Sequence, residues 1–239
     1  MKMKITIVLI IFLIIVVLSY FIMSKREMNY TILGEKEIFS NNLVSKNFSD
    51  LIYEKLSTEK NFGFYSKEFI KEDIRIIDLI NIIKDNQKSD NLSIQNILNR
   101  TNILILNIGN SEIYYKLSKL DIEENNDKIV YRYLDEITKD MVKLLKEIKK
   151  YNNSDIYVLG YYNNTNNMNN DKYYKYINNL MNNYCENNNI YFIDTYEILN
   201  KNIDYLSQNM PIYITNEGNI ALFNKIYSKI AKLYLHKQL

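Results

Sequence analysis

The sequence predicts an α/β protein: a three-layer α/β/α sandwich around a five-stranded, mostly parallel sheet, preceded by one transmembrane helix. Short runs rich in β-branched and aromatic residues alternate with longer segments whose apolar residues recur every three or four positions. This alternation is typical of parallel strands joined by amphipathic helices. A long uncharged apolar run at the N-terminus predicts the membrane helix.

Five segments have the composition of strands: residues 30–34, 61–64, 103–108, 156–161 and 190–193. The third and fourth are almost continuously apolar, as expected for central strands covered by helices on both faces. Five segments have a helical apolar spacing: residues 74–83, 93–98, 131–149, 173–186 and 220–235. No internal repeat or linker interrupts this series, so we expect one domain over residues 30–239.

The apolar run covers residues 5–23 and contains no charged residue. About 19 residues in a helix are long enough to cross the hydrocarbon core of a bilayer. Lys2 and Lys4 precede the run, Lys25 and Arg26 follow it, and neither a small-residue cleavage site nor a lipid-accepting cysteine ends it. The pattern indicates an uncleaved signal anchor, and a cleaved secretory signal is the alternative.

The anchor defines the expected topology. Residues 1–4 would lie in the cytoplasm and residues 24–29 would form a short linker. The domain would then be extracytoplasmic, in a single-pass protein of the cell membrane. The flanking charges are nearly balanced, so this orientation depends on the small excess of positive charge at the N-terminus.

Composition excludes several classes of function. The chain has 239 residues and a net charge of +2, and its Lys and Arg residues alternate with Asp and Glu. It therefore lacks the basic stripe of a nucleic-acid-binding protein. One cysteine, Cys185, and one histidine, His236, form neither a disulfide nor a clustered metal site. We expect no cofactor and no metal.

Candidate site residues follow from the predicted sheet, because ligands of open parallel sheets bind at the carboxyl ends of the strands. Polar residues follow the first three predicted strands, and another lies just before the last predicted helix. The candidate binding residues are Glu35, Lys36, Ser66, Ser111, Glu112 and Tyr213.

Three blocks carry a family resemblance: YTILGEKEIF, LILNIGNSEIYYKL and MPIYITNEGNIALFNKI. The first two consist of a strand followed by a polar segment, and the third consists of a small turn with Gly followed by a helix. In these blocks the chain resembles the SGNH, or GDSL-like, hydrolases, in particular the lipase-like, membrane-anchored or secreted group of low-GC Gram-positive bacteria. The resemblance covers most of residues 30–235 and implies a flavodoxin-like sandwich.

The resemblance also implies that the catalytic machinery is lost. The nucleophilic serine of the family falls on Lys36, and its oxyanion glycine and asparagine fall on Ser66 and Ser111. Its catalytic histidine and aspartate fall on Tyr213 and Met210. Acyl transfer needs an activated hydroxyl and donors aimed at the oxyanion. Lys36 has no hydroxyl, and a tyrosine is a poor base.

Two functions remain open. The first is a non-catalytic SGNH-like domain that binds or scaffolds an envelope lipid, glycan or protein, held at the membrane by its N-terminal helix. The alternative is an active SGNH/GDSL-type esterase or lipase-like hydrolase with a rearranged site, in which Lys36 works with Glu35 and Glu112. In the plainer interpretation, Lys36 pairs with one of these carboxylates and closes a disused cleft.

Two further features of the sequence concern tyrosine pairs and one pair of opposite charges. The tyrosine pairs are either a carbohydrate-stacking surface or half-buried helix and strand positions: Tyr114-Tyr115, Tyr161-Tyr162 and Tyr173-Tyr174. Arg75 and Asp78 lie one helical turn apart and are expected to form a local salt bridge.

Overall fold

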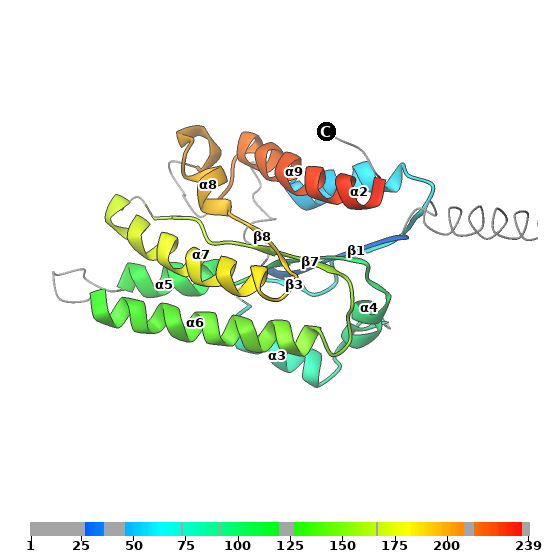
Figure 1. Cartoon of the computed structure of the whole chain (residues 1–239), viewed down its shortest axis with the longest axis horizontal. Coiled ribbons are helices and arrows are strands. Elements are labelled where there is room, and N and C mark those ends of the chain that lie inside the picture. Colours follow the sequence, from blue (N-terminus) through cyan, green and yellow to red (C-terminus); the bar gives the residue numbers. More distant parts are fainter. Residues whose placement is uncertain are drawn as a thin grey trace, which may run out of the picture.

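The fold is built on a parallel sheet with the strand order β2-β1-β6-β7-β8, and a short strand, β3, also pairs with β1 (Figure 1). The computed structural model describes residues 27–35, 46–72, 74–90, 92–119, 127–165, 167–207 and 213–235. The predicted membrane span at residues 5–23 lies outside these ranges. None of the helices within the ranges is long and apolar enough to span a membrane.

The strands of the sheet are β1 (Met28–Glu35), β2 (Phe62–Ser66), β3 (Ile70–Lys71), β6 (Ile103–Asn107), β7 (Asp155–Leu159) and β8 (Tyr191–Ile193). All their pairings are parallel. A separate antiparallel pair consists of β4 (Lys88–Ser89) and β5 (Leu92–Ser93). The helices are α2 (Phe48–Ser57), α3 (Ile76–Lys84), α4 (Ile94–Arg100), α5 (Asn110–Lys119), α6 (Asp127–Ile148), α7 (Asp171–Glu186), α8 (Thr195–Leu199) and α9 (Asn216–Ile230). Short turns of other helical types are η1 (Met168–Asn170), η2 (Ile203–Tyr205) and the π-helical η3 (Ala231–Leu235).

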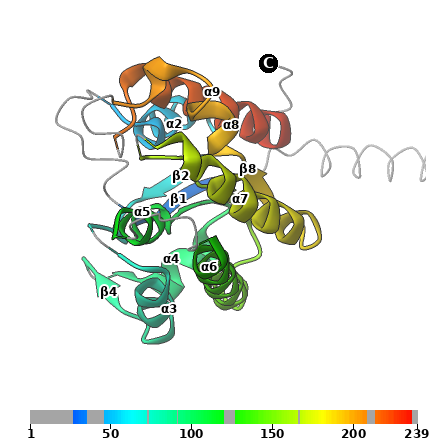
Figure 2. The same cartoon turned by 90° about the vertical axis from the view of Figure 1, so that its left-hand side faces the viewer.

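Helices cover both faces of the sheet. The helices α2, α8 and α9 lie on one side, and α3, α5, α6 and α7 lie on the other (Figures 1 and 2). Side chains along β1 alternate between two buried cores, so that Tyr30 and Ile32 belong to the α2/α9 core and Leu33 belongs to the α3/α6 core. All eight residues of β1 are buried, as expected for a central strand with both faces covered.

Polar residues define where several helices begin. The side chain of Asn47 accepts a hydrogen bond from the amide of Asp50 at the start of α2. Ser93 does the same for α4 and Thr215 for α9. Such caps satisfy amide groups that have no partner within the helix. They place the helix starts, and therefore the loops at the carboxyl ends of the strands.

The expected three-layer α/β arrangement with a mostly parallel sheet is confirmed. The predicted count of five strands was too low, because β3 was not foreseen. The helices α2, α5 and α8 were also missed. The strand β1 begins at Met28, so the last two residues of the predicted linker belong to the sheet.

The edge of the sheet beside β1 is a single chain segment with an irregular register. Ser66 of β2 pairs with Thr31, and Ile70 of β3 pairs with Gly34. Three steps along β1 therefore face four steps along the edge segment. Residues 67–69 form a turn between β2 and β3, in which the amide of Ile70 donates to the carbonyl oxygen of Lys67 at 3.2 Å. This turn interrupts the pairing with β1. The edge strand consequently ends at Lys71, beside Glu35, and not at Ser66.

Gly34 allows β1 and β6 to approach closely next to the site. Its φ is +129°, and a Cβ atom there would lie 1.7 Å from the carbonyl oxygen of Asn107. No other residue type fits this position without moving the backbone of β6. The glycine therefore fixes the geometry of the strand end that carries Glu35.

Candidate functional site

The carboxyl end of β1 carries the most enclosed group of the site, the side chain of Glu35. It is 0% exposed, and its Oε1 atom accepts a hydrogen bond of 2.5 Å from the amide of Gly109. Its Oε2 atom accepts hydrogen bonds of 3.2 Å from both the amide and the hydroxyl of Ser111. The buried carboxylate thereby joins β1 to the loop that follows β6.

The position of Glu35 has a clear electrostatic cause. Gly109 directly precedes α5, and Ser111 lies in its first turn. Amide groups at the start of a helix have no partner within the helix and favour negative charge. Hydrogen bonds to an ionised acceptor are stronger than neutral ones. The carboxylate thus satisfies donors that would otherwise be buried without partners.

Glu112 is the next residue along α5, and it faces a different element. Its Oε2 atom accepts a hydrogen bond of 2.9 Å from the amide of Ile76, the first residue of α3. Burial raises the pKa of Glu112, and the hydrogen bond from Ile76 partly opposes this. The hydroxyl of Tyr133 on α6 donates to the carbonyl oxygen of Glu112 at 3.2 Å. Glu112 therefore lies where α3, α5 and α6 meet.

A pocket of about 760 Å³ opens at this junction, and we call it the α5 pocket. The ammonium group of Lys116 lies 5.1 Å from the centre of the Tyr133 ring on its wall. Burial, followed by the charge of Glu112, raises the pKa of Tyr133 to about 12, so this phenol stays protonated at neutral pH. The lining residues are Ile74, Arg75, Ser111, Glu112, Tyr115, Lys116 and Tyr133.

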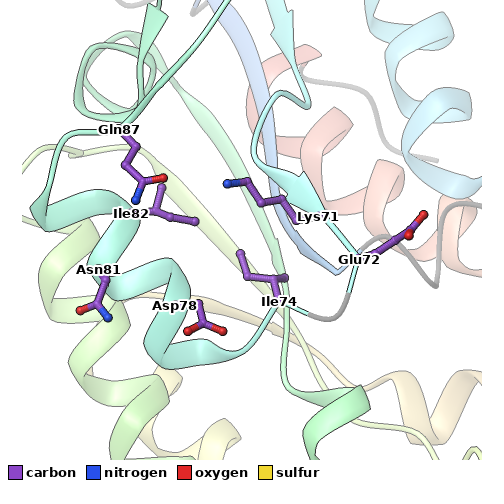
Figure 3. A pocket seen from close by; sticks show the side chains of 7 residues that line it. All are labelled: Lys71, Glu72, Ile74, Asp78, Asn81, Ile82 and Gln87. Atoms are coloured by element: carbon purple, nitrogen blue, oxygen red, sulfur yellow. The ribbon is translucent and has the colours of Figure 1, made fainter.

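A smaller pocket of about 360 Å³ lies on the other side of Ile74. Figure 3 shows Lys71 extending from β3 toward the α3 side, while Glu72 points away from the other labelled side chains. The lining of this smaller pocket is polar apart from two isoleucines and includes no aromatic ring. The lining residues are Lys71, Glu72, Ile74, Asp78, Asn81, Ile82 and Gln87.

The structure brings together only part of the predicted site. Glu35 and Ser111 are in contact, and Glu112 follows them on α5. Ser66 is set back along the sheet, level with Thr31, because a turn at residues 67–69 separates it from β3, whose Lys71 lies beside Glu35. Its Oγ atom is buried and has no hydrogen-bond partner among the described residues.

Tyr213 lies just before α9, and its carbonyl oxygen accepts a hydrogen bond from the amide of Ser207. Within the described ranges, no hydrogen bond or ion pair connects Tyr213 to Glu35, Ser66, Ser111 or Glu112. The remaining predicted positions, Lys36, Met210 and His236, lie outside the described residues.

Metal binding and cysteine chemistry have little support in the described part of the chain. No group of three or more His, Cys, Asp or Glu side chains there could hold a metal ion. Cys185 is buried in α7, and burial raises the pKa of its thiol to about 12. A thiol of this kind is not ionised at neutral pH and is a poor nucleophile.

Five lining residues of the α5 pocket were not predicted as site residues: Ile74, Arg75, Tyr115, Lys116 and Tyr133. They come from the residues just before α3, from α5 and from α6, so their proximity depends on how these helices pack. The expected salt bridge between Arg75 and Asp78 is present, with a distance of 3.0 Å. Of the tyrosine pairs, Tyr161-Tyr162 and Tyr173-Tyr174 are buried and cannot form a surface. Tyr115 is 47% exposed, and its ring contacts that of Tyr114 edge-on.

We predict that Glu35→Gln destabilises the domain by about 2–3 kcal/mol, because an amide group cannot accept from all the donors that surround the carboxylate. The measurement is the free energy of unfolding of the full-length chain in urea. Glu136→Gln, at an exposed position on α6, is the matched control and should change stability by less than about 0.5 kcal/mol. Equal effects of the two substitutions would show that the contacts of Glu35 contribute little.

Solved structures with the same fold were found by comparison of coordinates. The lipase Lip_vut3 from a goat rumen metagenome superposes with a TM-score of 0.70 at 15% identity, over 83% of this chain and 95% of the lipase. A member of the lipolytic G-D-S-L family from Veillonella parvula gives 0.60 at 13% identity, over 85% and 98%. A mutant of the acetylxylan esterase Axe2 from Geobacillus stearothermophilus gives 0.61 at 14% identity, over 86% and 96%. No protein-family model and no curated protein matches the chain. The chain therefore has the fold of the SGNH, or GDSL-like, hydrolases.

Proposed function

We propose that this chain is a non-catalytic SGNH-like protein that binds or scaffolds a component of the cell envelope. In this proposal, residues 5–23 anchor it in the cell membrane and the domain lies outside the cytoplasm. Two features support the proposal. One is the apolar run at the N-terminus, and the other is the set of hydrogen bonds around Glu35 at the carboxyl end of the sheet.

The contacts of Glu35 carry the proposal. An acyl-transfer site needs hydrogen-bond donors that are available to the oxyanion formed in the transition state. Here the amides of Gly109 and Ser111 and the hydroxyl of Ser111 donate to the buried carboxylate of Glu35. By the resemblance, Ser111 stands at the position of the family's oxyanion asparagine, and here its amide and hydroxyl are engaged by Glu35 within the fold. This supports a non-catalytic role.

The residues at the aligned catalytic positions support the same proposal. Catalytic mutants of the structurally similar esterase Axe2 replace a serine, an aspartate or a histidine. By the resemblance in sequence, these positions correspond to Lys36, Met210 and Tyr213 in this chain. The only histidine of the chain is His236, close to the C-terminus. A serine nucleophile would thus have no imidazole base at the expected place.

We predict that Lys36→Ser gives no hydrolysis of a p-nitrophenyl ester above that of the wild-type chain, because restoring a hydroxyl does not restore a base. Lys36→Ala is the matched control, since it removes the lysine without adding a hydroxyl. Turnover by the serine variant alone, abolished by a serine-directed inhibitor, would mean that a base is present and would favour the hydrolase alternative.

The anchor leads to a separate prediction. The chain should stay in the membrane fraction after an alkaline carbonate wash, because a helix of about 19 apolar residues is stable in the bilayer. Protease added to intact spheroplasts should degrade the domain. A mature N-terminus near residue 25 would contradict the anchor, and protection equal to that of a cytosolic marker would reverse the orientation.

A further inference from the structure

The α5 pocket offers an aromatic ring to a ligand. Tyr115 lines it and is 47% exposed, although it is one of the large apolar side chains of the chain. Tyr133 provides a second ring, with Lys116 above it. The flat faces of aromatic side chains pack well against apolar C–H groups. A ligand with a flat face carrying such groups would therefore gain contact area here.

The wall of the pocket also presents a carboxylate oxygen to which no described residue donates a hydrogen bond. The Oε2 atom of Glu112 accepts from the amide of Ile76, whereas its Oε1 atom accepts no hydrogen bond from the described part of the chain. A partly buried acceptor gains free energy when a donor reaches it. Hydroxyl groups of a ligand would supply this donor, and the hydrocarbon chain of a lipid would not.

Positive charge completes the lining of the pocket. Arg75 uses Nε and Nη2 to bind Asp78, which leaves its Nη1 atom without an acceptor among the described residues. Lys116 has no carboxylate within 4.0 Å in these ranges, and its described contact is with the ring of Tyr133. With the carboxylate of Glu112, the lining carries two positive groups and one negative group. This balance disfavours a cationic ligand and favours an anionic substituent on the side of Lys116 and Arg75.

We infer that the α5 pocket binds an anionic pyranose, that is, a sugar ring of an acidic glycan. The ring would stack on Tyr115, its hydroxyl groups would donate to Glu112, and its anionic substituent would face Lys116 and Arg75. A neutral sugar would leave the cations unused, and a simple anion would leave Tyr115 and Glu112 unused. This inference rests on the proposed binding function and adds the chemical class of the ligand.

The test is calorimetric titration of the purified full-length chain in detergent with trigalacturonate. We expect saturable binding that weakens at least tenfold with fully methyl-esterified trigalacturonate, which keeps the rings but loses the charge. Tyr115→Ala and Lys116→Met should each weaken binding at least tenfold, and acetate alone should not bind. Tyr53→Ala is the matched control, because Tyr53 is 38% exposed on α2 in the opposite layer, and it should bind like the wild type.

The same titrations distinguish a wrong ligand class for the α5 pocket from a wrong non-catalytic function. Equal affinity for the acid and its methyl ester, or binding insensitive to both Tyr115→Ala and Lys116→Met, would overturn the assignment of an anionic pyranose to this pocket. Absence of binding, with no methanol released from the ester, would overturn the inference and leave the non-catalytic proposal standing. Release of methanol by the wild-type chain would instead show ester hydrolysis and overturn the proposed function.

Discussion

The hydrogen bonds between the Glu35 carboxylate and the start of α5 are the interaction on which the site depends. They connect the end of β1 with the loop after β6, and Gly34 permits the close approach of these two strands. The first turn of α5 then places Ser111 and Glu112, and Glu112 in turn holds the first amide of α3. The α5 pocket lies along this series of contacts. A buried carboxylate thus organises the part of the fold that contains Ser111 and the α5 pocket.

Much of the fold could be predicted because its central strands are distinctive. Residues 103–107 and 156–159 are buried on both faces and consist mostly of apolar residues, so their assignment needs no tertiary information. The helix α2 was missed although Asn47 caps it and Phe48, Ile52 and Leu56 form its buried face. The short strand β3 could not be foreseen, because two residues give no periodicity and their pairing with β1 follows a turn at residues 67–69.

The only site residues that could be predicted from the sequence are those at the ends of the parallel strands. Glu35 and Ser111 end or follow neighbouring parallel strands, and such residues meet at one edge. The same reasoning placed Ser66 at that edge, but the turn at residues 67–69 separates it from β3. Tyr115, Lys116 and Tyr133 face one pocket because α5 and α6 pack together in the same layer. Helix packing of this kind depends on contacts between segments that are distant in sequence, which an apolar spacing does not reveal.

Amide hydrogen exchange at Gly109 and Ser111, followed by NMR, tests the central claim most directly. If both amides donate to the buried Glu35 carboxylate, they should exchange as slowly as amides in the central strands, because exchange then requires the site to open. Exchange of both amides within minutes, at rates typical of exposed loops, would contradict the account. The donors at the start of α5 would then be available, and an oxyanion site would again be compatible with the structure.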